Sequence, residues 1–84
     1  MQETLGFRIR RARMYRGMTQ AALARAIGMS TQSMNMIETG NTPDPGASRV
    51  RDIARVLRVS TDFLLGLTDI MGEETRSTEP ALAS

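Results

Sequence analysis

The sequence has no cysteine and no histidine, and all 11 of its basic residues are arginine. Without cysteine there can be no disulfide framework and no thiolate metal site. Without histidine the chain lacks the commonest general base and the commonest metal ligand. There is also no glycine-rich phosphate loop, and the carboxylates show no paired arrangement for acid–base chemistry. We therefore expect neither an enzyme nor a bound cofactor or metal.

Aromatic residues and long apolar runs are also scarce. The aromatic side chains are Phe7, Tyr15 and Phe63. No apolar run is long enough for a transmembrane helix, so no membrane partner is expected. Residues 1–13 are charged and amphipathic, which is not the pattern of a signal peptide. These features favour a cytoplasmic protein.

The chain is short, and residues 1–66 carry a net positive charge. A chain of 84 residues without staples is expected to form one compact helical domain. Residues 1–66 carry ten arginines against five acidic residues, a balance of +5, and residues 67–84 carry one against four, a balance of −3. A basic body suits a polyanionic partner, although an ordinary solvated surface can have the same charge. Arginine is the basic side chain that best matches phosphate and guanine.

The apolar spacing predicts five helices and no strand. They are expected over residues 4–15, 20–26, 31–39, from 47 onward, and 61–65. Helix N-caps are expected at Thr19, Ser30 and Ser60. A glycine that can adopt the left-handed conformation is expected to end each of the first three helices. The predicted buried residues are Leu5, Ile9 and Ala12 in the first helix, Ala22, Leu23, Ala26 and Ile27 in the second, and Met34 and Ile37 in the third. The fold class is therefore all-α, a compact five-helix bundle.

Two stretches are expected to lie outside helices. Residues 41–46, with two prolines, form a loop. Residues 1–67 form the domain, and residues 68–84 a polar, flexible C-terminal tail that is disordered or a linker from 73 onward.

Residues 19–40, TQAALARAIGMSTQSMNMIETG, contain the functional pattern. Two short helices are joined by a tight turn that Gly28 permits, and such a unit can place its second helix in the major groove of DNA. On a helical wheel Met34 and Ile37 face the core. The outward face is then Thr31, Gln32, Asn35 and Met36. Amides can pair with adenine and methyl groups can contact thymine, so these four are candidate base-reading residues.

The chain resembles the phage repressor and Cro helix-turn-helix family, also called the Xre family. The resemblance is carried by LGFRIRRAR at 5–13, GMTQAALARAIGMSTQSMNMIETG at 17–40 and IARVLRVSTDFLLG at 53–66. It implies a five-helix DNA-binding domain of the phage repressor type, with the helix-turn-helix formed by helices 2 and 3. It further implies a transcriptional regulator, expected to be a repressor that inserts helix 31–39 into the major groove. Such proteins usually bind palindromic double-stranded DNA as homodimers, which here implies association with the nucleoid.

The resemblance also implies roles for residues around the third helix. Gln20 matches a glutamine that hydrogen-bonds a DNA phosphate, although it can also be read as a plain helix-starting residue. The other implied backbone-contacting residues are Thr19, Ser33, Asn41, Thr42 and Arg16. Arg13 and Glu38 match a partly buried structural ion pair; the alternative is two solvated charges. The remaining arginines of the body are interpreted as solvated: Arg8, Arg10, Arg25, Arg49, Arg51, Arg55 and Arg58.

The sequence departs from the family pattern at Ala12, in the longer loop 41–46, and at Met36, an uncommon base-reading residue. Two alternative functions stay open. One is an antitoxin that represses its own operon with a bound toxin, and the other is a protein-interaction module on the same fold. Protein partners of these kinds, or a regulatory domain, are therefore possible. For a homodimer, the expected surface is residues 61–67 with Ile70 and Met71.

Overall fold

The computed structural model describes residues 3–72, which form five α-helices and no strand. The helices are α1 (Leu5–Tyr15), α2 (Gln20–Ala26), α3 (Thr31–Thr39), α4 (Ala47–Leu57) and α5 (Thr61–Leu64). The all-α prediction is confirmed. The first helix begins one residue later than predicted and the fifth ends one residue earlier, because Thr4 and Leu65 are caps. None of these five helices is long and apolar enough to cross a membrane.

Local hydrogen bonds define where four of the helices begin. The side-chain oxygens of Thr4, Thr19, Ser30 and Ser60 each accept from a backbone N–H three residues later, over 3.0–3.1 Å. These bonds satisfy amides that have no partner within the helix. The fourth helix begins differently, after Gly46 at φ 97° with no side-chain cap.

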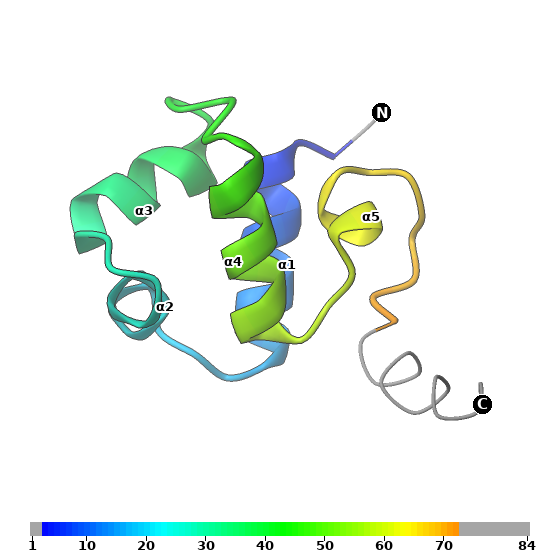
Figure 1. The fold of residues 1–84 in the computed structure, drawn as a ribbon, viewed down its shortest axis with the longest axis horizontal. Coiled ribbons are helices and arrows are strands. Elements are labelled where there is room, and N and C mark those ends of the chain that lie inside the picture. Colours follow the sequence, from blue (N-terminus) through cyan, green and yellow to red (C-terminus); the bar gives the residue numbers. More distant parts are fainter. Residues whose placement is uncertain (1–2, 73–84) are drawn as a thin grey trace.

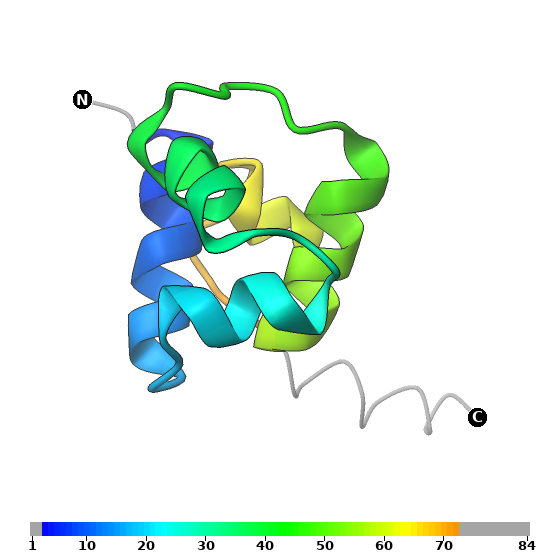
Figure 2. The same ribbon diagram turned by 90° about the vertical axis from the view of Figure 1, so that its left-hand side faces the viewer.

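The helices enclose one apolar core. Figure 1 places α2 and α3 at one end of the molecule and α5 at the other, with α1 and α4 between them. Figure 2 looks from the α2–α3 end and shows α1 and α4 on opposite sides. The largest fully buried side chains come from all five helices: Phe63, Ile9, Leu23, Met34, Ile53, Leu57 and Leu64.

The buried face of α2 differs from the prediction. Leu23 and Ala24 are buried, Ala22 and Ile27 are half-buried, and Ala26 is exposed. The predicted burial of Ala26 is therefore wrong. Alanine buries so little apolar area that an alanine-rich helix does not define its own buried face. The helices packed against α2 decide it instead.

The backbones of α1 and α3 meet at Gly6. A Cβ atom at this position would lie 2.6 Å from the carbonyl oxygen of Glu38 and closer still to that of Ile37. Only glycine permits this approach. Gly6 therefore fixes how closely the third helix packs on the first.

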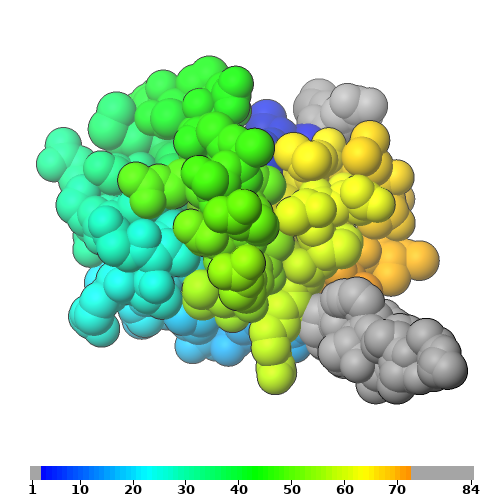
Figure 3. All heavy atoms as spheres, viewed as in Figure 1, coloured from blue at the N-terminus to red at the C-terminus, as the bar shows by residue number. Residues whose placement is uncertain are grey.

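The chain continues to pack against the bundle after α5. The buried guanidinium of Arg8 donates to the carbonyl oxygens of Phe63 (3.2 Å) and Thr68 (3.3 Å) and to Asp69 Oδ1 (3.3 Å). The backbone N–H of Ser60 donates to the Met71 carbonyl over 2.8 Å, and Met71 packs on the core. Figure 3 shows this segment covering the α5 end of the molecule. Residues 68–71 therefore pack on the bundle, although the predicted domain ends at residue 67. The predicted disorder of residues 73–84 lies outside the described residues.

Candidate nucleic-acid interface

The two helices of the predicted motif are joined by a turn of four residues. Gly28 has φ 75°, and the N–H of Met29 donates back to the Ala24 carbonyl over 2.8 Å. The left-handed residue lets the chain leave α2 and begin α3 at the Ser30 cap. As a result α2 and α3 lie together at one end of the molecule, where Figures 1 and 2 show α3 on the outside.

The outward face of α3 is the one predicted from the sequence. Met34 and Ile37 are buried, whereas Thr31, Gln32, Asn35 and Met36 are exposed. The exposed residues carry no charge, since the one charged residue of this helix, Glu38, is buried. α3 therefore offers solvent a surface of amide, hydroxyl and thioether groups. That these groups read bases stays a prediction.

A partly buried ion pair joins α3 to α1. Arg13 donates from Nε to Glu38 Oε2 (2.8 Å) and from Nη2 to Glu38 Oε1 (3.1 Å). The two side chains are 12% and 2% exposed. Arg13 also donates to the Met18 carbonyl over 2.8 Å. The pair implied by the family resemblance is thus present, with the bidentate geometry that arginine favours.

Gln20 extends this pair toward the exposed face. Its Nε2 donates to Glu38 Oε1 over 3.2 Å, and its Oε1 accepts from Asn35 Nδ2 over 3.4 Å. A continuous chain of polar contacts therefore runs from Arg13 in the bundle to Asn35 on the surface. Within the described residues, one N–H of the Gln20 amide has no hydrogen-bond partner. The oxygen and one N–H of the Asn35 amide also have none. The predicted phosphate contact of Gln20 is not tested by these bonds.

The other predicted backbone-contacting residues near α3 are Thr19 before α2, Ser33 within α3, and Asn41 and Thr42 after α3. Thr19 Oγ1 caps α2, and Ser33 Oγ accepts from the Ser30 hydroxyl over 2.9 Å. Beyond the helix, Asn41 is exposed, and the Thr42 N–H donates to the Met36 carbonyl over 3.0 Å. Their roles on DNA stay predictions.

Arg16 lies elsewhere. It donates from Nε to the Leu57 carbonyl (2.7 Å) and from Nη2 to the Arg58 carbonyl (2.9 Å). The guanidinium thus caps the C-terminal end of α4, where carbonyls lack helical partners. The predicted contact of Arg16 with the DNA backbone stays a prediction.

The sequence analysis missed a polar hollow between α1, α2 and α3. It has a volume of about 590 Å³ and is lined by Arg10, Arg13, Gln20, Asn35, Glu38 and Thr39. The sequence alone predicts that Arg10 is a solvated surface residue, whereas the structure places it in the lining of this hollow. Its position three residues before Arg13 is the signal that could have placed it on the same side of α1, because residues i and i+3 share a helix face.

The geometry agrees with what sequence and structure comparison finds. The profile of the family described as "Helix-turn-helix domain" matches residues 4–64, which span all five helices. The chain belongs to this helix-turn-helix family. α2 and α3 are the two helices that give the family its name.

Two similar proteins extend this result. The uncharacterized HTH-type transcriptional regulator YazB of Bacillus subtilis (strain 168) is 42% identical over 62 residues, which cover 74% of this chain and 88% of YazB. The solution structure of the DNA-binding domain of the P22 C2 repressor superposes with a TM-score of 0.75 at 28% identity. That match covers 86% of this chain and 92% of the repressor domain. The phage repressor type of bundle predicted from the sequence is therefore confirmed.

Proposed function

We propose that this helix-turn-helix protein represses transcription by binding a specific double-stranded DNA site with α3 in the major groove. Its family and repressor-type fold make it a DNA-binding transcriptional regulator. The observation that carries the finer proposal is the uncharged, exposed face of α3, held on the bundle by the buried Arg13–Glu38 pair. The same relatives favour a regulator over an antitoxin or a protein-interaction module.

Base reading would come from the four exposed residues of α3. Gln32 and Asn35 each offer an amide that can donate and accept at once, which suits the N6 and N7 edge of adenine. Thr31, in the first helical turn, and Met36 present methyl groups that can contact the thymine methyl. Because neither amide carries a charge, each loses little solvation free energy on entering the groove compared with an ionised group.

Backbone contacts would come from the two ends of the motif. Gln20 and Thr19 lie at the start of α2, Ser33 lies in the first half of α3, and Asn41 and Thr42 follow it. Contacts from such positions fix the protein's register on the duplex but carry little sequence information.

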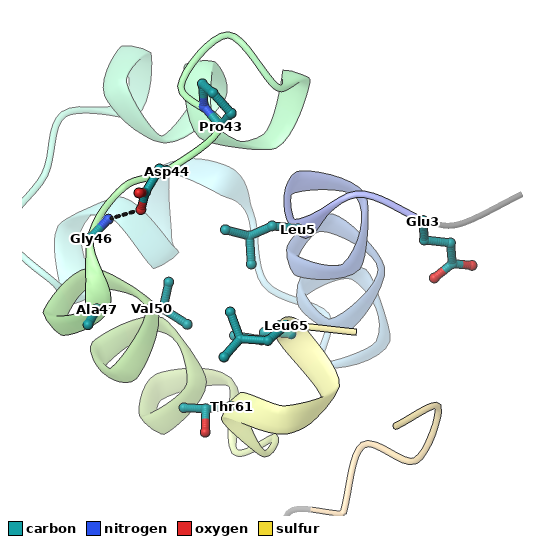
Figure 4. A pocket seen from close by; sticks show the side chains of 10 residues that line it. Glu3, Leu5, Pro43, Asp44, Gly46, Ala47, Val50, Thr61 and Leu65 are labelled. Atoms are coloured by element: carbon teal, nitrogen blue, oxygen red, sulfur yellow. Dashed lines mark hydrogen bonds between the residues drawn. The ribbon is translucent and has the colours of Figure 1, made fainter. Parts of the chain in front are cut away.

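We further propose that two copies pair through the α5 end of the molecule. Leu67 and Ile70 are 72% and 71% exposed there. A hollow of about 530 Å³ lies between α1, α4, α5 and the loop that follows α3. Figure 4 shows Leu5, Val50 and Leu65 pointing into it. Exposed apolar groups beside an apolar hollow suit a second copy of this chain. The segment that carries Leu67 and Ile70 follows α5, at the opposite end from α3, so pairing centred on these two residues would leave both recognition helices free.

Sedimentation of the wild type and of Leu67→Asp tests the pairing. The wild type should form a dimer at high concentration, and the substitution should shift it toward the monomer. A wild type that stays monomeric on operator DNA would remove this part of the proposal.

The central experiment is selection of bound duplexes from a random library, followed by a salt titration of the enriched sequence. A palindromic consensus is expected, with affinity that falls steeply as salt rises because phosphate contacts release counterions. If no sequence is enriched, base reading by α3 is excluded. A reporter placed behind the selected site then tests repression, since expression should fall when the protein is present.

A further inference from the structure

We propose that Arg10 supplies the positive charge that binds one backbone phosphate of the DNA at the hollow between α1, α2 and α3, beside the phosphate contact that the family resemblance implies for Gln20. The inference rests on the proposed function and adds a residue that the sequence analysis assigned to solvent. Its basis is the pattern of contacts made by the arginines of α1.

Arg10 differs from the other arginines of this helix. Arg8 is buried against Phe63 and the segment after α5, Arg11 pairs with Glu3 over 2.7 Å, and Arg13 pairs with Glu38. The Arg10 side chain is exposed, and within residues 3–72 it has no hydrogen-bond or ion-pair partner. It is therefore the cation of α1 that is available to an external anion.

The charges around the hollow leave Arg10 uncompensated. The hollow is lined by two cations, Arg10 and Arg13, and one anion, Glu38. Both oxygens of Glu38 already accept from Arg13, and one also accepts from Gln20. The Arg13–Glu38 pair is thus internally neutral, and the hollow has a net charge of about +1. A compact anion there would meet an attractive field.

The position of the hollow selects a DNA phosphate as that anion. Asn35 and Thr39 of α3 form one wall, so the hollow borders the helix proposed to enter the major groove. When a helix lies in the groove, the sugar-phosphate backbone passes directly beside it. A guanidinium can bind a phosphate through two parallel hydrogen bonds, and the remaining N–H of Gln20 can add a third. This also gives Gln20 its phosphate contact without disturbing the bond to Glu38.

Arg10→Gln tests the proposal, with Arg11→Gln as the matched control. Both substitutions remove one charge from neighbouring positions of α1, but Arg11 lies over the Phe63 ring, 5.5 Å from its centre, on the α5 side. Arg10→Gln should weaken binding to the selected site and to random duplex alike by about tenfold, and make the negative slope of log K against log salt shallower by about 0.9. Arg11→Gln should leave both quantities nearly unchanged. Arg10→Lys should keep the slope and lose part of the affinity, because ammonium retains the charge but not the fork.

Ethylation of individual phosphates gives a second measurement. At least one phosphate whose ethylation blocks the wild type should become indifferent in Arg10→Gln. Equal losses for the two glutamine variants would show a general charge effect and overturn the proposal, as would unchanged binding by Arg10→Gln. A wild type that binds no duplex in a salt-dependent way would instead refute the proposed function itself.

Discussion

The Glu38 carboxylate accepts three hydrogen bonds, two from Arg13 and one from Gln20. Removing such a group from water is costly unless charged donors replace the lost solvation. Here they do, and the same carboxylate fixes the position of Gln20, which in turn contacts Asn35. One buried residue therefore sets the geometry of two surface side chains.

Glu38→Ala should lower the free energy of unfolding by about 3 kcal/mol, because it leaves the buried Arg13 without its counter-charge. Urea denaturation measures this directly. The double variant Arg13→Met/Glu38→Leu should recover part of the loss, since it leaves no buried charge unpaired. A single variant within about 0.5 kcal/mol of the wild type would show that the pair contributes little to stability.

Gln32→Ala should weaken binding to the selected site by at least about tenfold and binding to random duplex hardly at all, because its amide is expected to contact a base edge. Competition titrations with the two DNAs measure the ratio. Gln20→Ala is the comparison, since loss of a phosphate contact should weaken both complexes to a similar degree. A Gln32 variant that loses the same factor in affinity for the selected site and for random duplex would contradict base reading.

At the scale of helices, the elements set by local chemistry were predictable. The hydroxyl caps and the left-handed glycines act within a few residues, so the bounds of α2 and α3 agree with the prediction. Features that depend on another helix were not predictable in the same way. The exposure of Ala26 depends on the helices packed against α2, and the partner of Arg16 depends on the packing of the end of α1 against α4. The hollow beside Arg10 depends on the packing of α1, α2 and α3.

Gly6 provides the sharpest helix-scale prediction. Intrinsic propensity alone predicts that Gly6→Ala stabilises α1 by up to about 1 kcal/mol. The contact with α3 predicts the opposite, because the added methyl would lie 2.6 Å from the Glu38 carbonyl oxygen. We expect the contact to dominate and the melting temperature to fall by about 5 °C or more, as for other overpacked contacts.

Gly17→Ala is the control for Gly6→Ala. Gly17 has φ 71°, and a methyl group added there would meet nothing within 4 Å, so the substitution should cost backbone strain alone, about 1 kcal/mol. A stabilised Gly6→Ala variant would mean that α1 and α3 separate easily.

At the scale of the whole molecule, the two ends present surfaces of different chemistry. The α2–α3 end presents the polar face and the hollow with Arg10, whereas the α5 end presents exposed leucine and isoleucine. The segment after α5 belongs to this second end, because Arg8 and the N–H of Ser60 bind its carbonyl groups. Composition alone suggested a flexible tail from residue 68, since a polar sequence gives no sign of bonds made by its backbone.

Ending the chain at residue 67 should therefore destabilise the domain, with a chain ending at 72 as the reference. The shorter chain loses the partners of Arg8 at Thr68 and Asp69, the backbone bond from Ser60 and the apolar contact of Met71. Together these are worth roughly 2 kcal/mol, or about 10 °C in melting temperature. Thermal unfolding by circular dichroism measures the difference, and identical curves would show that the segment is not part of the folded unit.

The close contact at Gly6 also bears on how the proposed dimer would measure DNA. The tilt of α3 on the bundle depends on how near α1 can approach it, and Gly6 permits the nearest approach. Two-fold symmetry repeats any change of tilt in the second protomer, so the two recognition helices would move apart or together by twice the single displacement. Half-site centres of dimeric helix-turn-helix proteins lie about one helical turn of DNA apart, roughly 34 Å, so in the proposed dimer such a change would select operators with a different number of central base pairs. In the proposed dimer a residue without a side chain, buried between α1 and α3, would thus help to determine operator length.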